Sequence, residues 1–128
     1  LENLSRKVMT DDPVTALALD ALGSAAVEQL IIEVCGYFER SFGEGYFFSQ
    51  PLGPGMDGWA VADGQPALFH LVDGSSIGVT LTDSCLMLPI KSASFVLGVS
   101  GTPFSAGSIC AFCGLKETCR YRGNHHHG

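Results

Sequence analysis

The stretch "DDPVTALALDALGSAAVEQLIIEVCGYFER" (residues 11–40) decides the fold class of this chain. Asp12-Pro13 is a helix-start signal, because Asp caps free backbone N–H groups and Pro is accommodated at the first helical position. Apolar residues then recur at three- and four-residue steps, the spacing of one helix face. This stripe consists of Leu19, Leu22, Ala26, Leu30, Val34 and Phe38. The pattern predicts one helix from Pro13 to about Arg40, ended by Gly43.

The rest of the chain alternates turns with short apolar segments. Residues 46–50, 77–81 and 95–100 have the composition of strands, whereas residues 64–74 read as a second, shorter helix closed by a glycine. No regular β-α-β repeat is present, and the strands gather late in the chain. The sequence therefore predicts an α+β domain, with a long N-terminal helix and a shorter second helix flanking a sheet.

The composition excludes several classes of protein. The chain has 128 residues, of which 46% are hydrophobic and 16% charged, so it is globular rather than disordered. A net charge of -6 argues against nucleic acid or an anionic membrane as the main partner. No apolar run approaches the roughly 20 residues of a membrane span, and the start lacks a signal peptide, so the cytoplasm is the expected location.

A glycine- and proline-rich loop, "PLGPGMDGW", occupies residues 51–59. Gly53, Gly55 and Gly58 leave backbone groups unshielded, and such a loop can hold a small ligand through main-chain hydrogen bonds. Trp59 adds a flat apolar face. The simpler interpretation is that the loop is only a turn.

A polar cluster follows the strand expected at residues 77–81. Thr82, Asp83 and Ser84 place a carboxylate between two hydroxyls, which can hydrogen-bond a polar ligand or a water molecule. The same three residues also suit a turn or a helix cap, and the residues alone leave both interpretations open. No catalytic pairing with histidine is evident, because His70 is the only histidine outside the tail.

A third motif, "CAFCGLKETC", places Cys110, Cys113 and Cys119 in a C-x2-C-x5-C pattern. The C-x2-C spacing lets two thiolates reach one metal, and Cys85 is the candidate for a fourth ligand. Four thiolates suit an iron–sulfur cluster or structural zinc, and the spacing does not choose between them. Three reduced thiols without a metal are the alternative.

Three segments occur in an order and spacing that point to one family. They are "DDPVTALALDALGSAAVE" (residues 11–28), "LGPGMDGWAVADGQPALFHLVDG" (residues 52–74) and "IGVTLTDSCLMLPIKSASFVLGVS" (residues 77–100). Together they resemble the activation domain of vitamin B12-dependent methionine synthase, and more closely its short stand-alone bacterial form. The resemblance covers residues 5–101.

The resemblance implies an α+β domain with a bent, partly antiparallel sheet that binds S-adenosylmethionine. Such a domain closes over a cobalamin-binding domain or corrinoid protein, which carries the cobalamin. When the cofactor has been oxidised to cob(II)alamin, an electron and the methyl group of S-adenosylmethionine restore methylcobalamin. The resemblance thus implies an accessory domain rather than a complete enzyme.

The two ligand motifs of the family have counterparts in this sequence. The family's P-G-Y loop, which holds S-adenosylmethionine largely through its backbone, corresponds to Pro54, Gly55 and Met56, beside Trp59. The family's T-E-S stretch, which faces the ligand and the corrinoid, corresponds to residues 82–84 (TDS). These residues form the predicted binding site.

The leading hypothesis is therefore an S-adenosylmethionine-binding module for reductive reactivation of a cobalamin-dependent methionine synthase or related corrinoid methyltransferase. A cluster on the four cysteines would supply the electron. The alternatives are a small Cys-ligated iron–sulfur or zinc protein without S-adenosylmethionine, and a purely structural relative. We expect one domain over residues 1–122, truncated at its N-terminus relative to the family, with a Cys-rich segment at 108–122 and an affinity-tag remnant at 123–128.

Overall fold

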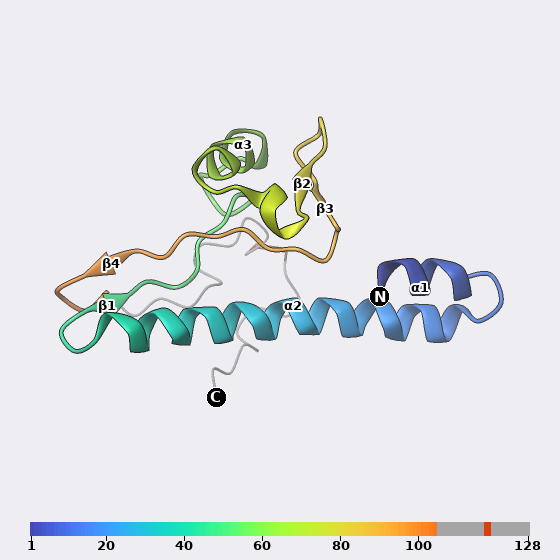
Figure 1. Cartoon of the computed structure of the whole chain (residues 1–128), viewed down its shortest axis with the longest axis horizontal. Coiled ribbons are helices and arrows are strands. Elements are labelled where there is room, and N and C mark those ends of the chain that lie inside the picture. Colours follow the sequence, from blue (N-terminus) through green and yellow to red (C-terminus); the bar gives the residue numbers. More distant parts are fainter. Residues whose placement is uncertain (105–116, 119–128) are drawn as a thin grey trace.

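The computed structural model describes residues 1–104 and 117–118, so Cys110, Cys113, Cys119 and the tail lie outside the described residues. The described chain contains both helices and short antiparallel strands without a regular β-α-β repeat, which confirms the α+β class (Figure 1). The elements are α1 (Glu2–Val8), α2 (Pro13–Phe42), β1 (Phe47–Phe48), α3 (Val61–Leu71), the 3-10 helix η1 (Gly74–Ile77), β2 (Thr80–Leu81), β3 (Met87–Leu88) and β4 (Val99–Ser100).

Helix α2 confirms the prediction for the first half of the chain. The Asp12 carboxylate accepts hydrogen bonds from Thr15, one from the backbone N–H at 3.0 Å and one from Oγ1 at 2.6 Å. These bonds lower the pKa of Asp12. The helix ends before Gly43, whose φ of 79° favours glycine. Its 30 residues span about 45 Å and run the length of the molecule (Figure 1).

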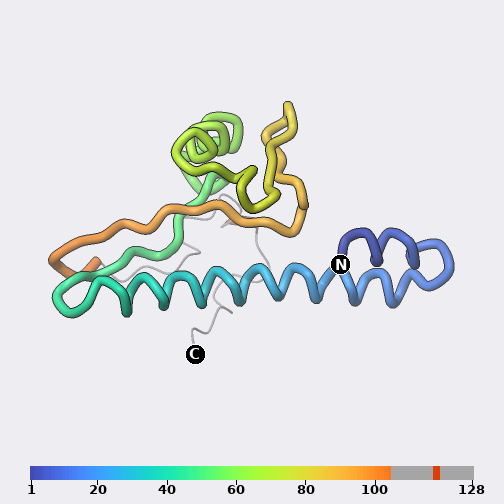
Figure 2. The backbone as a smooth tube through the Cα atoms, viewed as in Figure 1, coloured from blue at the N-terminus to red at the C-terminus, as the bar shows by residue number. Residues whose placement is uncertain are grey.

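Helix α1 was not expected from the sequence. It folds back beside the start of α2 as an antiparallel hairpin (Figure 2). The contact is close because it uses small residues: Ser5 is buried and donates from Oγ to the carbonyl oxygen of the buried Ala16 at 2.9 Å. Seven residues form a helix here because they pack on α2, since isolated helices of that length are unstable in water.

Strands β1 and β4 form a narrow antiparallel ladder that we call the stem. Phe48 faces Val99 in its register, and an isolated bridge between Leu52 and Val96 extends it. Ser49 reinforces it twice, because its N–H donates to the Gly98 carbonyl at 2.9 Å and its Oγ accepts from the Gly98 N–H at 2.8 Å. The stem brings together segments that lie far apart in the sequence.

An aromatic cluster fixes the turn between α2 and the stem. Phe42, at the end of α2, makes edge contacts with Tyr46 and Phe48, with ring centroids 5.8 and 5.3 Å away. Such edge-to-face pairs are favourable beyond the area they bury. Gly43 and Gly45, both with positive φ, let the chain reverse direction within this cluster.

Beyond the stem, residues 53–95 form a small lobe that stands above α2 (Figure 1). It contains α3, η1 and the β2–β3 hairpin, in which Leu81 faces Met87. Strand β2 is shorter than the strand predicted at residues 77–81. The reason is that Asp73 accepts a hydrogen bond from the Ser75 N–H at 3.1 Å and starts the 3-10 helix η1, which includes Ile77. The described strands thus form two separate antiparallel pairs rather than one continuous sheet.

Burial in the described part of the chain is low, with Ala16 and Leu68 as its buried apolar residues. Leu22, Leu30 and Phe38, three residues of the predicted apolar stripe, are exposed. Over an 18-residue window α2 has a mean hydropathy of 1.4, with 11% of the window buried. By length and composition alone α2 could cross a membrane. The length of its uninterrupted apolar runs does not indicate this. Core helices and signal sequences pass the same test.

Candidate functional site

The glycine-rich loop is a compact structure closed by its own backbone. The Gly55 N–H donates to the Trp59 carbonyl at 2.8 Å, and the Trp59 N–H donates to the Met56 carbonyl at 3.0 Å. The Met56 N–H donates to the Gly53 carbonyl at 3.2 Å. Gly55 has a φ of 100°, which a residue with a side chain rarely adopts. The backbone conformation of the loop thus explains why glycine occupies position 55.

Close contacts at glycine hold this loop on α3. A Cβ added to the buried Gly64 would lie 2.4 Å from Nε1 of Trp59 and 2.8 Å from Cγ of Pro54. Both rings therefore lie against the helix backbone, and glycine is the residue that leaves room for them. Trp59, expected to offer its face to a ligand, has one part of its ring engaged with α3.

The buried Gln65 side chain links α3 to the segment of the chain that returns to the stem. Its Oε1 accepts a hydrogen bond from Ser94 Oγ at 2.9 Å. The Ser94 carbonyl oxygen in turn lies 2.9 Å from where a Cβ of Gly53 would be. The loop is thus packed between α3 and the returning chain.

The cluster Thr82-Asp83-Ser84 forms the turn of the β2–β3 hairpin. The Cys85 N–H donates to the Thr82 carbonyl at 2.9 Å, and the Thr82 hydroxyl bonds Ser84 Oγ at 3.0 Å. Thr82 Oγ1 also accepts from the Leu86 N–H at 3.1 Å. Asp83 and Ser84 are exposed at the tip. The turn interpretation is therefore confirmed, and it leaves the Asp83 carboxylate available at a rigid position.

The loop and the turn meet at the first turn of α3. A Cβ on Gly55 would lie 3.3 Å from Cγ2 of Val61, and Cys85 Sγ lies 4.0 Å from the carbonyl oxygen of Ala62. The glycine loop and Cys85, the residue directly after the Thr82–Asp83–Ser84 turn, thus approach adjacent residues of α3, although they lie more than twenty positions apart in the sequence. We call this place the α3 junction.

The acidic character of the lobe is not apparent from any single sequence motif. Residues 41–90 contain five acidic side chains and no Lys or Arg, so this segment of the sequence carries -5 of the net charge of -6. Three of the five lie on elements of the α3 junction: Asp57, Asp63 and Asp83. Such a field favours a cationic ligand. The signal was present in the sequence as a fifty-residue gap between cations.

A metal site remains a prediction. Within residues 1–104 and 117–118, no group of three or more His, Cys, Asp or Glu side chains is placed to hold a metal ion. Cys85 is a half-buried free thiol, and the other three predicted ligands lie outside the described residues. Cys35 on α2 is also a free thiol, and burial together with the nearby Glu39 raises its pKa, which keeps it unreactive.

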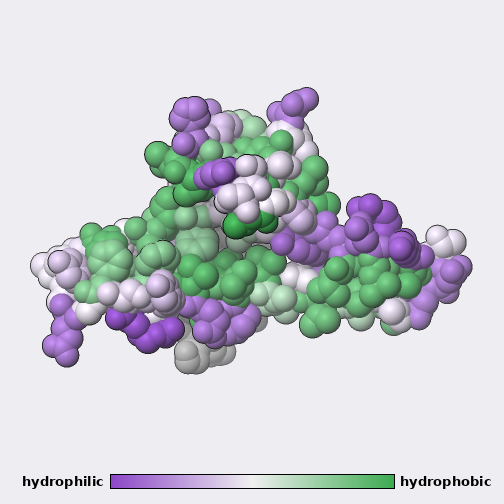
Figure 3. Space-filling model, in the orientation of Figure 1, coloured by the Kyte–Doolittle hydropathy of each residue, from purple (hydrophilic) through white to green (hydrophobic). Residues whose placement is uncertain are grey.

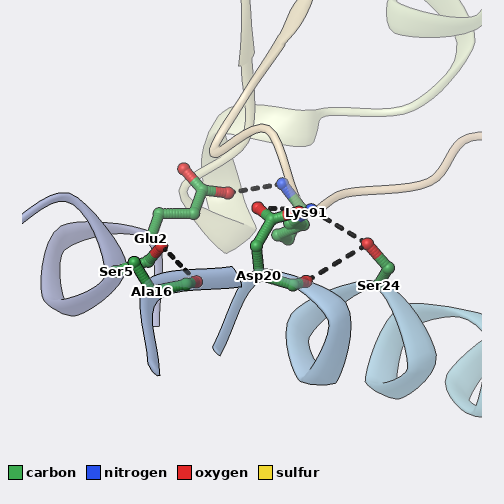
Figure 4. Close-up of polar contacts among 6 residues, drawn as sticks. All are labelled: Glu2, Ser5, Ala16, Asp20, Ser24 and Lys91. Carbon is green, nitrogen blue, oxygen red and sulfur yellow. Dashed lines mark hydrogen bonds and ion pairs between the residues drawn. The ribbon is translucent and has the colours of Figure 1, made fainter. Parts of the chain in front are cut away.

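A second polar cluster, not predicted from the sequence, joins the lobe to the helices (Figure 4). Lys91 Nζ lies 2.9 Å from Asp20 Oδ1 and 2.9 Å from Ser24 Oγ, while its backbone N–H donates to Glu2. The Lys91 stem passes 3.3 Å from where a Cβ of Gly23 would be. A cavity of about 550 Å³ lies beside these residues, between α1, α2 and the chain after β3.

Comparison with models of known families, with curated proteins and with solved structures finds no match for this chain.

Proposed function

We propose that this chain is an S-adenosylmethionine-binding module that serves the reductive reactivation of a cobalamin-dependent methionine synthase or a related corrinoid methyltransferase. The observation that carries the proposal is the α3 junction. The loop holding Pro54, Gly55 and Met56 and the turn holding Asp83 were assigned to one ligand by the resemblance. Their contact with adjacent residues of α3 supports that shared role.

The chemistry of the junction fits a sulfonium ligand. S-Adenosylmethionine is cationic at sulfur, and residues 41–90 supply carboxylates without any Lys or Arg. The N–H groups of Gly55, Met56 and Trp59 are already bonded within the loop. The loop would therefore hold the ligand through carbonyl oxygens, each of which can accept a second hydrogen bond. When bound, S-adenosylmethionine supplies the methyl group.

The hairpin turn has a positioning role in this proposal. Thr82 Oγ1 bonds Ser84 Oγ and accepts from the Leu86 N–H. These bonds fix the backbone on both sides of Asp83, so its carboxylate needs no reordering when the ligand arrives. The tip is exposed, and it offers a surface to the partner protein that carries cobalamin. Docking of that partner would exclude water from the junction during methyl transfer.

The electron for reactivation needs a redox group, which S-adenosylmethionine does not supply. An iron–sulfur cluster on Cys85, Cys110, Cys113 and Cys119 stays a prediction, as does zinc at the same position. The free thiols of Cys35 and Cys85 suit a reducing compartment, and the cytoplasm is the location that we propose.

Calorimetric titration with S-adenosylmethionine, and with S-adenosylhomocysteine as the analogue that lacks the sulfonium charge, tests the proposal. We expect saturable binding of both, with the sulfonium form bound more tightly because of the acidic lobe. Gly55→Val should abolish binding, since Gly55 has a φ of 100° and Val61 lies against it.

Gly45→Val is the matched control, because Gly45 has a φ of 92° but lies in the turn after α2 with no atom near its Cβ position. It carries a similar backbone penalty at a distant site and should bind normally. Absence of binding by the parent chain, or equal loss in both variants, would show the proposal to be wrong.

A further inference from the structure

The outward face of α2 carries apolar side chains that nothing in the described residues covers. The packed face is marked by the buried Ala16 and Gly23, which lie against α1 and Lys91. On other sides of the helix, Val14 is 79% exposed, Leu17 69% and Ile32 62%. Figure 3 shows apolar surface on the right-hand part of the lower edge of the molecule, where the first half of α2 lies.

The sequence along this face is self-complementary. Positions 14, 18, 21, 25, 28 and 32 follow one another at alternating steps of four and three, the spacing of a helix-pairing seam. The seam reads Val14, Ala18, Ala21, Ala25, Glu28 and Ile32. It is symmetric about residue 23, with branched apolar residues at its ends and alanines at its centre. A two-fold axis at the centre of such a seam superposes it on itself.

We propose that α2 docks against α2 of a second copy of this chain, antiparallel, about a two-fold axis near Gly23. Val14 then packs on Ile32 of the second copy, and Ala21 packs on Ala25 of the second copy. The alanines allow the helix axes to approach closely at the crossing point, where small residues reduce the interaxial distance. Leu17 and Leu22 flank the seam and cover its sides.

Two carboxylates argue against a lipid bilayer as the occupant of this face. Glu28 and Glu33 both lie near the middle of the apolar part of α2. A charged residue at the centre of a membrane span opposes insertion. The net charge of -6 also repels an anionic membrane surface. A second copy of the chain leaves Glu33 outside the seam and places Glu28 near its end, whereas a bilayer would surround both carboxylates.

The exposed area sets the strength of the expected dimer. The exposed parts of Val14, Leu17, Leu22 and Ile32, together with the alanines, amount to on the order of 500–600 Å² per copy, below the ~800 Å² of a standard interface. Glu28 also falls opposite Ala18 of the second copy and weakens each end. We therefore expect a reversible dimer with a Kd in the micromolar range rather than an obligate one.

Sedimentation velocity of the full chain from about 1 µM to about 500 µM tests this proposal. The mass should rise reversibly from 13.5 kDa toward twice that value. Ala21→Glu should keep the chain monomeric throughout, because it places a charge at the crossing point. Glu28→Leu should tighten the dimer at least about tenfold, and that gain in affinity does not depend on a damaging substitution.

Leu71→Glu is the control, since Leu71 is 81% exposed on α3 and the substitution should leave the Kd unchanged. Oxidative cross-linking measures the orientation: Val14→Cys should link to Ile32→Cys in a mixed sample and not to itself, with the parent chain measuring background. A monomer at every concentration, self-linking of Val14→Cys, or binding of Glu28→Gln and the parent to phosphatidylcholine vesicles in place of dimerisation would each overturn the proposal.

Discussion

The helical hairpin α1–α2 and the lobe of residues 53–95 are stable for different reasons. The hairpin is long and regular, and its shape follows from helix periodicity with a few fixed points such as Ser5 on Ala16. The lobe consists of short elements held by close approach at Gly53 and Gly64 and by main-chain hydrogen bonds. A change on the outside of α2 should therefore be tolerated, whereas a single methyl group in the lobe should not.

The two regions also differ in charge and in surface. Residues 41–90 contain no Lys or Arg, so the lobe is acidic apart from Lys91, which pairs with Asp20 of α2. The hairpin presents an apolar face instead. In our proposals these differences separate two kinds of binding, with a small cation at the lobe and another protein chain at the hairpin.

The largest expected effect comes from Gly64→Ala. The new Cβ would lie 2.4 Å from Trp59 Nε1 and 2.8 Å from Pro54, both in rigid rings, so the loop must move off α3. We expect a loss of about 2–3 kcal/mol in the free energy of unfolding of the lobe. Urea unfolding followed by fluorescence of Trp59, the one tryptophan, measures it.

Circular dichroism, which is dominated by α2, should show a much smaller change in the same samples. Gly101→Ala is the control, since nothing lies near its Cβ position. Equal shifts in the two signals would mean that the lobe and the hairpin unfold as one unit, and the comparison drawn above would fail.

Lys91→Met should have an intermediate effect, because it cuts the polar link between the two regions. The substitution keeps an unbranched stem over Gly23 but removes the ion pair with Asp20 and the bond to Ser24. Asp20 is 55% exposed, so we expect a loss of about 0.5–1 kcal/mol. Differential scanning calorimetry should show a broader transition, as the lobe melts ahead of α2. Lys7→Met on α1 should leave the width unchanged, and an unchanged width in both would contradict a linking role for Lys91.

The smallest effect, and the one of opposite sign, should come from Cys85→Gly. Cys85 has a φ of 61°, a conformation that costs a non-glycine residue roughly 1–2 kcal/mol. Glycine relieves that cost but adds flexibility to the unfolded chain, so we expect a net gain of about 0.5 kcal/mol. Cys85→Ala keeps the strain and should not raise the melting temperature, which separates backbone relief from loss of the thiol. Equal stabilisation by both variants would contradict this explanation.

The sequence predicts those parts of the fold that depend on local signals. Helix α2 is one, because Asp12, Pro13 and Gly43 act within a few residues of its ends. Helix α1 escaped prediction, since its stability comes from the contact of Ser5 with Ala16 rather than from its own residues. The predicted apolar stripe through Leu22 and Leu30 is exposed in the described residues, because periodicity identifies an apolar face without identifying what covers it.

The candidate site was predictable in its parts but not in its arrangement. The glycine loop and the Thr82–Asp83–Ser84 turn are visible as motifs, and both are also turns in the structure. That they meet at Val61 and Ala62 depends on how Gly64 accepts Trp59, a contact in space that has no pattern in sequence. The role of Lys91 was missed for the same reason, because its partners Asp20 and Ser24 lie about seventy residues away.

The stem joins the lobe to the rest of the molecule at a single place. Its two ends leave and re-enter the molecule side by side, where Ser49 bonds Gly98 and Leu52 faces Val96. Closing an excursion of about fifty residues there costs roughly 3.5 kcal/mol of chain entropy in its length-dependent part, but doubling its length would add only about 0.6 kcal/mol. Insertions, or exchange of the whole lobe for another, are thus cheap at this point of the chain. The helical hairpin can therefore carry different ligand-binding lobes without a change in its own contacts.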